Sequence, residues 1–329
     1  MNGEVLHRVF YNEVVAHPPR VRAYTFGIYP RPLRLIAATR RDPEGSRELA
    51  RSESRRIIGL QERAGLPLLS DPLLEWDDML RWFALEWRGV RADGILRYFE
   101  HNAFYRVPVV EGELGTDGGV LRRHLVIGAR GRAVLEVPEP LTFALMSRDS
   151  HYGSLEALTS AIARALNEDL CSAEGEIGPA LIAVKGPALV HGEARGRLDL
   201  AARASFELLD SCRAPALLHL YFKSPLGAYR ELSGMRSAYA GFALDATRDD
   251  RGRLAEGLRG YKMSELALGL VDAQNTRVEG VEELAGAAEA LGRAAGVEAM
   301  VTVSSDLEFL PYSFAMRKVR VLGRLARHA

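Results

Sequence analysis

The sequence predicts an α/β fold, namely a (β/α)8 TIM barrel with a hairpin-containing excursion after the second strand. Short apolar runs that suit buried strands alternate with helical periodicity along the chain, about eight times in all. No Gly-x-Gly-x-x-Gly follows the first predicted strand, which disfavours an open doubly wound sheet. A chain of 329 residues, 47% of them hydrophobic, can fill one large barrel. We therefore expect residues 1–329 to form a single barrel, with residues 89–132 as the excursion.

The predicted elements follow from local patterns. Residues 1–20 are expected to be irregular, because Pro18 and Pro19 break any helix. Within the excursion, strand-like runs at 105–110 and 120–127 flank a Gly-rich segment at 115–119, which signals a hairpin. The barrel strands are predicted over residues 21–29, 67–70, 141–146, 180–184, 215–223, 240–244, 267–271 and 299–303. Helices are predicted over residues 44–64, 73–87, 155–170, 198–209, 226–235, 281–295 and from Pro311 onward.

Composition narrows the class of partner. Lys+Arg and Asp+Glu are both 43, so the net charge is zero and nothing indicates a nucleic acid or an anionic membrane as partner. The sequence has no apolar run long enough to span a membrane and no signal-peptide pattern, so we expect a cytoplasmic protein. Its two cysteines, Cys171 and Cys212, are too few for a disulfide framework or a thiolate metal cage. The scarcity of Asn and Gln hints at a thermophile.

The barrel model places functional side chains at one mouth, where the carboxyl ends of the strands meet. The strand predicted over 215–223 carries His219 and Tyr221 to this edge. Mixed charge around the mouth suits a small zwitterionic or anionic ligand, although a solvated rim of hydrogen-bonded residues has the same composition. The candidate mouth residues are Tyr29, Arg31, Asp71, Arg148, Lys185, His219, Tyr221, Asp245, Asp272 and Asp306.

Five stretches, in order along the chain, match motifs of one family. Residues 25–31 (TFGIYPR) resemble T-x-I-G-S-[FY]-P-R, and residues 268–279 resemble L-G-[VL]-[VI]-D-x-x-x-x-R-x-E. Weaker matches lie at residues 78–83, 140–144 and 186–189. Together they resemble the cobalamin-independent methionine synthase family, in particular its short single-barrel archaeal forms.

The resemblance implies a zinc site that this sequence has altered. The family binds zinc through a His-x-Cys pair, a Glu on the next strand and a second Cys, and the zinc lowers the pKa of the homocysteine thiol. Here His219 is kept, Tyr221 replaces the first Cys, Asp245 replaces the Glu, and Asp306 stands at the second Cys. Lys185 occupies the position of an acid that holds the substrate ammonium. The resemblance therefore implies a degenerate zinc and homocysteine site.

Three interpretations follow. The favoured one is a non-zinc subunit that binds a methyl-pterin or folate donor, or a zinc-bearing methionine synthase subunit, and so serves methionine biosynthesis. The second is an active methyltransferase of the 5-methyltetrahydropteroyl-homocysteine type that holds a metal on His219, Asp245 and Asp306, since one His and two carboxylates suit Mn, Fe or Zn. The third is a non-catalytic scaffold.

Overall fold

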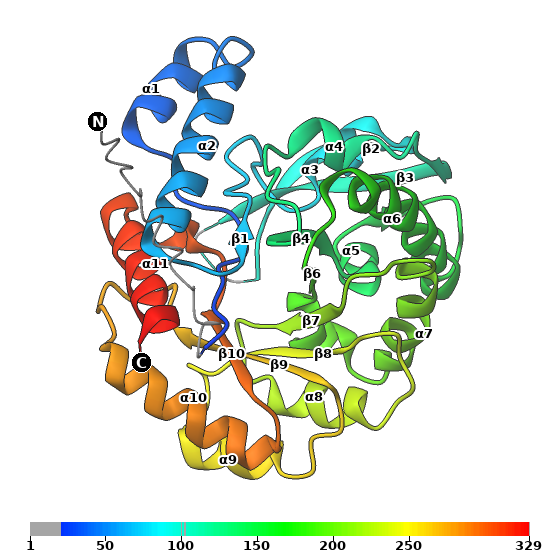
Figure 1. The fold of residues 1–329 in the computed structure, drawn as a ribbon. Coiled ribbons are helices and arrows are strands. Elements are labelled where there is room, and N and C mark those ends of the chain that lie inside the picture. Colours follow the sequence, from blue (N-terminus) through cyan, green and yellow to red (C-terminus); the bar gives the residue numbers. More distant parts are fainter. Residues whose placement is uncertain (1–20, 100, 102, 329) are drawn as a thin grey trace, which may run out of the picture.

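A curled sheet of seven parallel strands forms the centre of the molecule (Figure 1). The computed structural model describes residues 21–99, 101 and 103–328, so the irregular segment predicted over residues 1–20 lies outside the described residues. The strand order is β1-β4-β6-β7-β8-β9-β10. The bounds are β1 Leu69–Ser70, β4 Ala133–Pro138, β6 Leu181–Lys185, β7 Ala216–Leu220, β8 Gly241–Asp245, β9 Glu265–Val271 and β10 Ala299–Val303.

The gap between β10 and β1 is filled by residues 21–29. Ala23 forms a parallel bridge with Val301 of β10. On the other side, the Thr25 hydroxyl lies 2.7 Å from the Ser70 hydroxyl of β1. The strand predicted over 21–29 is therefore reduced to one bridge, and side chains complete the closure. The α/β barrel class predicted from the sequence is confirmed.

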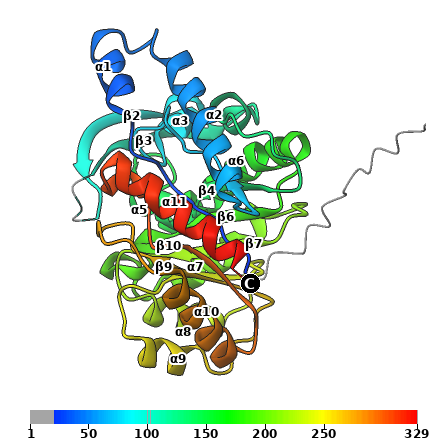
Figure 2. The ribbon, with the colours of Figure 1, turned by 60° about the vertical axis from the view of Figure 1, so that its left-hand side comes forward.

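Helices surround the sheet. In order they are α1 Leu33–Arg41, α2 Arg47–Ala64, α3 Arg81–Glu86, α4 Val120–His124, α5 Pro140–Leu145, α6 Leu155–Ile177, α7 Leu198–Leu208, α8 Leu226–Ser233, α9 Arg251–Leu258, α10 Val281–Ala295 and α11 Tyr312–Arg327. Short 3-10 turns lie at η1 Pro187–Val190, η2 Gly192–Ala194 and η3 Leu307–Phe309. Helix α11 packs against both α10 and α2, which closes the outer layer, and α1 projects from the body with the start of α2 (Figure 2). No helix in the described ranges is long and apolar enough to cross a membrane.

The excursion after β1 contains an antiparallel hairpin of β2 Arg88–Arg97 and β3 Phe104–Gly115. The short strand β5 Arg148–Asp149 joins β3 to complete a three-stranded sheet. The hairpin turn predicted at 115–119 is wrong, since the turn lies between β2 and β3. The strand predicted over 120–127 is also wrong: residues 120–124 form α4, and Asp169 accepts a hydrogen bond from the Val120 N–H at its start.

The strand predicted over 141–146 is the largest correction, because these residues form α5 and the barrel strand is β4. Glu139 caps α5 by accepting hydrogen bonds from the N–H groups of Leu141 and Thr142, and Pro140 opens the helix. The helix is buried on nearly all sides, so its apolar run has no helical periodicity. The helix predicted over 73–87 is reduced to α3, and Leu73, where it was predicted to begin, adopts a positive φ of 54°.

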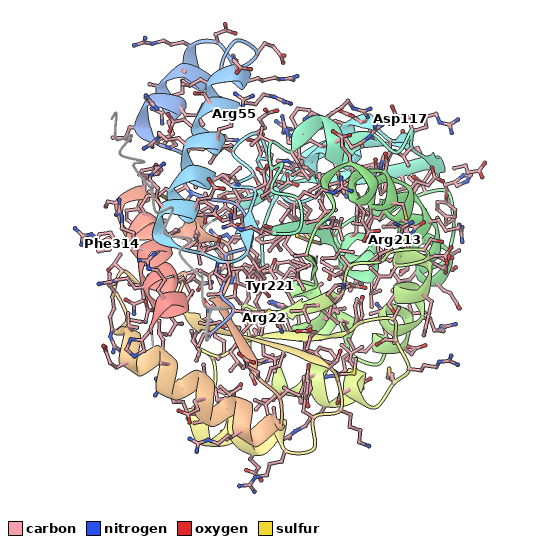
Figure 3. The ribbon with its side chains drawn as sticks, viewed as in Figure 1. Arg22, Arg55, Asp117, Arg213, Tyr221 and Phe314 are labelled. Carbon is pink, nitrogen blue, oxygen red and sulfur yellow. The ribbon has the colours of Figure 1, made fainter. Side chains whose placement is uncertain are left out.

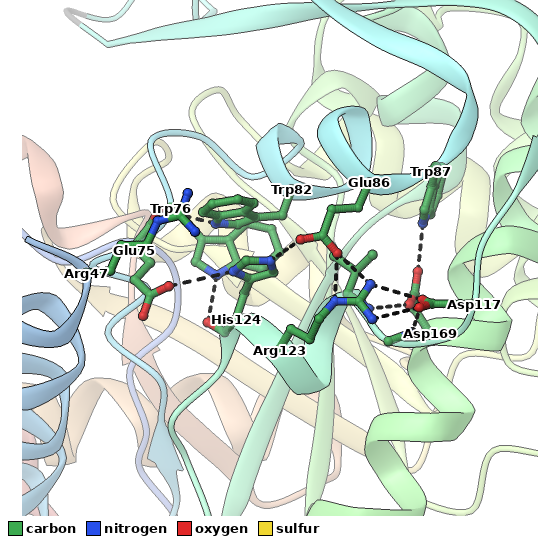
Figure 4. Close-up of polar contacts among 12 residues, drawn as sticks. Arg47, Glu75, Trp76, Trp82, Glu86, Trp87, Asp117, Arg123, His124 and Asp169 are labelled. Atoms are coloured by element: carbon green, nitrogen blue, oxygen red, sulfur yellow. Dashed lines mark hydrogen bonds and ion pairs between the residues drawn. The ribbon is translucent and has the colours of Figure 1, made fainter. Parts of the chain in front are cut away.

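Aromatic and charged side chains attach the excursion helices to the barrel (Figure 4). His124 of α4 stacks on Trp82 of α3 with ring centroids 3.6 Å apart, and its Nε2 lies 2.5 Å from Glu86. Asp169 of α6 accepts a hydrogen bond from the Trp87 indole at 2.7 Å. These contacts link α3, α4 and α6 and thereby fix the base of the hairpin.

Candidate functional site

The mouth is lined by buried polar side chains from several strands. Lys185 ends β6 and is paired in register with His219 of β7. The Nε2 atom of His219 shares a hydrogen bond of 3.2 Å with the Tyr24 hydroxyl, and Phe26 packs against the imidazole edge. Burial, together with the Lys185 charge, lowers the pKa of His219 to about 3. The imidazole is therefore neutral at physiological pH.

Lys185 forms a buried ion pair with Glu136 of β4. The Nζ atom lies 3.2 Å from the Glu136 carboxylate, and only 2% and 3% of the two side chains are exposed. Burial raises the pKa of Glu136 to about 7, while Lys185 and the Gly27 N–H oppose the shift. The ammonium of Lys185 is thus neutralised from within the barrel.

Two successive backbone N–H groups also point into the mouth. The Gly27 N–H donates to Glu136 at 2.8 Å, and the Ile28 N–H donates to Asp306 at 2.9 Å. Gly27 has a φ of 79°, and a Cβ there would lie within 2.3 Å of the Asp306 carboxylate, so only glycine fits. Successive N–H groups of this kind form an anion-binding concavity. Here the protein's own carboxylates occupy it.

Asp245, at the end of β8, has both carboxylate oxygens engaged. Thr247 donates to Oδ1 through its backbone N–H and its hydroxyl, while Arg248 Nε donates to Oδ2 at 3.0 Å. The Phe222 N–H also approaches Oδ2, at 3.3 Å. By contrast, the Nδ1 atom of His219 and the Oδ2 atom of Asp306 are buried and have no hydrogen-bond partner among the described residues.

The tip of the β2–β3 hairpin covers the mouth. The Tyr98 hydroxyl lies 3.4 Å from that of Tyr221, which Figure 3 labels near the centre of the molecule. Phe222 adopts a positive φ of 84° and packs edge-on against Tyr98 and Phe309. A bulky residue in this backbone region is strained, so packing must hold it there. The aromatic cluster separates the polar interior of the mouth from solvent.

The other residues predicted to line the mouth lie in different parts of the structure. Asp71 is buried and accepts hydrogen bonds from three backbone N–H groups, so it organises the loop after β1. Asp272 is partly exposed and accepts from the Gln274 N–H at 2.8 Å. Arg148 lies exposed on β5, so it does not follow a strand of the parallel sheet as the sequence suggested. Tyr29 and Arg31 line an open groove beside the mouth.

This groove has a volume of about 1240 Å³ and lies between helices α1 and α2 on one side and the start of α11 on the other. Arg31 is fixed by the Leu74 carbonyl at 3.0 Å and by Asp77 at 2.8 Å. Burial and the nearby Asp306 carboxylate raise the pKa of Glu308 to about 8. The groove is lined by Ile28, Tyr29, Pro30, Arg31, Pro32, Leu33, Arg34, Ile36, Arg56, Trp76, Asp77, Glu308, Leu310, Pro311, Tyr312 and Ser313.

Sequence reasoning missed Glu136, Tyr98 and Glu308. Glu136 was missed because β4 was misplaced, although a single acid inside the apolar run 133–138 is a usable signal. No local pattern places Tyr98 at the mouth, because only the folding of the hairpin over the barrel brings it there.

Curated relatives share most of the chain. The methionine synthase of Thermococcus kodakarensis is 26% identical over 277 residues, covering 79% of this chain and 78% of that protein. The methionine synthase of Sulfolobus acidocaldarius is 23% identical over 315 residues, covering 89% of this chain and 87% of that protein. No family model matches the sequence.

Solved structures share the fold. A B12-independent methionine synthase from Shewanella sp. W3-18-1, in complex with selenomethionine, superposes with a TM-score of 0.71 at 17% identity, covering 93% of this chain and 97% of that one. A putative B12-independent enzyme from Listeria monocytogenes gives 0.69 at 14% identity, covering 93% and 98%. These relatives and the shared fold support the resemblance of the chain to the cobalamin-independent methionine synthase family.

The donor set of this methionine-synthase-like chain does not fit a thiolate-bound zinc. The two cysteines of the chain, Cys171 on α6 and Cys212 before β7, lie away from the strand ends that form the mouth. The Asp245 carboxylate is committed to Arg248 and Thr247. In the part of the chain that the structure describes, no group of three or more His, Cys, Asp or Glu side chains is placed to hold a metal ion. A metal on His219, Asp245 and Asp306 stays a prediction that needs Asp245 to leave these partners.

Proposed function

We propose that this methionine-synthase-like chain serves methyl transfer as a non-zinc subunit that binds a reduced methyl-pterin donor and works with a zinc-bearing methionine synthase subunit. The observation that carries the proposal is the large groove beside a mouth whose charged side chains Lys185, Glu136 and Asp306 contact one another or the protein backbone. A ligand of drug size needs about 300–1,000 Å³. The groove, at about 1240 Å³, has room for a pterin and its acidic tail.

The charges along the groove suit the two ends of such a donor. A pterin ring presents amino and ring N–H donors, which carboxylates such as Asp77 and Glu308 accept. With its pKa near 8, Glu308 also carries a proton near neutral pH and can donate to the ring carbonyl. Trp76 and Tyr312 add aromatic lining.

Arginine side chains also line the groove. Arg34 and Arg56 both pair with the single buried carboxylate of Glu53, which leaves one positive charge in excess. Arg56 also donates to the Tyr312 hydroxyl at 2.5 Å, which holds it at the groove. An arginine binds a carboxylate through two parallel hydrogen bonds, so these arginines suit the acidic tail of a folate-type donor.

The internal contacts of the mouth support a role without homocysteine. Lys185 and Glu136 pair with each other, and Glu136 and Asp306 also accept from the Gly27 and Ile28 N–H groups. Binding homocysteine in the family's manner would require these internal contacts to break. The methyl-transfer chemistry would then belong to the partner's zinc.

Donor binding is tested by titrating methyltetrahydrofolate against tryptophan fluorescence. Arg56→Met should weaken binding about tenfold, since the charge-assisted contact of Arg56 with the acidic tail is lost. The matched control is Arg55→Met, because Arg55 is exposed on the same helix and does not line the groove. No binding by the native chain, or equal loss in both variants, would refute the groove as the donor site.

The non-zinc role is tested by turnover. Protein given zinc, homocysteine and methyltetrahydrofolate should form no methionine above background, and protein purified without chelator should hold less than about a tenth of an equivalent of metal. Added to a zinc-competent relative, it should raise that enzyme's rate or its affinity for the donor. Robust turnover by this chain alone would overturn the proposal. The absence of any effect on a partner would also refute it and would favour a non-catalytic scaffold.

A further inference from the structure

The two cysteines of the chain lie in contact although they are far apart in sequence. Cys171 lies on α6 and Cys212 lies in the loop between α7 and β7. Their Sγ atoms are 3.9 Å apart, and both residues are partly exposed. The family motifs do not involve either residue, so this contact is independent of the proposed function.

Hydrogen bonds on both sides of the thiols hold the loop on α6. Asn167, one turn before Cys171, donates to the carbonyls of Leu208 and Asp210 at 3.0 and 2.8 Å. Glu174, one turn after it, accepts from the N–H groups of Arg213 and Ala214 at 2.9 and 2.7 Å. Residues 167, 171 and 174 share one face of the helix. The approach of the two sulfur atoms is therefore built into the local fold.

We propose that Cys171 and Cys212 form a reversible intramolecular disulfide when the protein meets a small-molecule disulfide such as oxidised glutathione. A disulfide bond is about 2.05 Å long, so the sulfur atoms must approach by roughly 2 Å. Side-chain rotation on the partly exposed surface can supply this movement, because the backbone on either side is already positioned.

The exchange balances without any other reactant. The Cys171 thiolate attacks one sulfur of oxidised glutathione, which forms a mixed disulfide and expels one glutathione thiolate. The Cys212 thiolate then attacks the Cys171 sulfur, which closes the protein disulfide and expels the second glutathione. The two protons released by the cysteines are taken up by the two glutathione thiolates. The protein is oxidised by two electrons, and glutathione disulfide is reduced by two.

The second step should be slow near neutral pH. Burial raises the pKa of the Cys212 thiol well above its ordinary value, and the neighbouring Cys171 and Glu174 add to the shift. Closure should therefore accelerate as pH rises.

The bond would join the outer helical layer to the amino end of β7, away from the mouth. Arg213, the neighbour of Cys212, lies well to the side of Tyr221 in Figure 3. Closing this loop of about 40 residues restricts the unfolded chain and should raise the melting temperature by about 5 °C. It should leave donor binding in the groove unchanged.

The test uses the full chain incubated with oxidised glutathione at pH 8.5. We expect a mass lower by two hydrogens, loss of both alkylatable thiols, a higher melting temperature, and reversal of all three by dithiothreitol. Cys171→Ser and Cys212→Ser should each show no such melting shift on oxidation. Two free thiols, a separate glutathione adduct on each cysteine, or a covalent dimer would overturn the proposal. Since none of these readouts uses the donor, their failure is distinguishable from failure of the proposed function.

Discussion

Lys185 and Glu136 stabilise each other in a region that excludes water. Each is nearly fully buried, so removing one partner leaves the other as an uncompensated buried group. We expect Lys185→Met to lower the free energy of unfolding by about 3–5 kcal/mol. Urea denaturation measures this loss.

A double variant separates loss of the pair from loss of packing. Lys185→Met combined with Glu136→Gln should recover most of the stability, because neither residue then carries a charge. If the two single losses simply add in the double variant, the ion pair is not coupled as described.

At the residue scale, the rule that strand ends meet at one mouth placed Lys185, His219, Tyr221 and Asp306 in one buried region. The rule cannot state what each side chain binds. Asp245 shows this limit, because its partner Arg248 is set by the turn that follows β8 and not by the strand. Arg148 was misassigned because its preceding run was taken as a strand.

At the scale of elements, closure of the barrel depends on Gln61 of α2. Its side chain donates to the Ser70 carbonyl at 2.9 Å and accepts from the Ser70 N–H at 3.0 Å, so it replaces a neighbouring strand on the free edge of β1. Gln61 is fully buried. Gln61→Met should cost about 2–4 kcal/mol, since two buried backbone groups lose their partners.

The neighbouring Glu62 provides the control for this prediction. It is exposed, and its ion pair with Arg132 is long, at 3.8 Å. Glu62→Met should change the free energy of unfolding by less than about 0.5 kcal/mol. Equal losses in the two variants would contradict the role of Gln61 as a substitute strand.

The sequence predicted most elements from residue 155 onward, because strands and amphipathic helices alternate there with clear periodicity. Errors are concentrated between residues 70 and 150. There α5 is buried on nearly every face and α4 is only five residues long, so neither has a readable helical period. The turn between β2 and β3 also lacks the Gly-rich signal that residues 115–119 carry without forming a turn.

At the scale of the whole molecule, buried carboxyl groups make stability depend on pH. Burial is the leading cause that raises the pKa of Glu136 and Glu139 to about 7, that of Asp78 to about 6 and that of Glu308 to about 8. The folded state therefore binds more protons than the unfolded state between about pH 4 and 8. The stabilisation that these protonated carboxyl groups provide is fully present below their pKa values in the unfolded chain. It is lost as pH rises through their pKa values in the folded state.

Glu139 gives the cleanest test, because it is fully buried and its carboxylate accepts from the backbone N–H groups of Leu141 and Thr142. We expect the native chain to be more stable at pH 5 than at pH 8 in urea denaturation. Glu139→Gln should reduce that difference by on the order of 2 kcal/mol, because the amide cannot lose a proton. It should also cost about 1 kcal/mol at pH 5, since one of the two capping hydrogen bonds is lost.

Glu44→Gln is the matched control, because the Glu44 side chain is 80% exposed. This variant should keep the native difference in stability between pH 5 and pH 8. A native chain that gains stability from pH 5 to pH 8 would show that these carboxyl groups ionise freely inside the barrel.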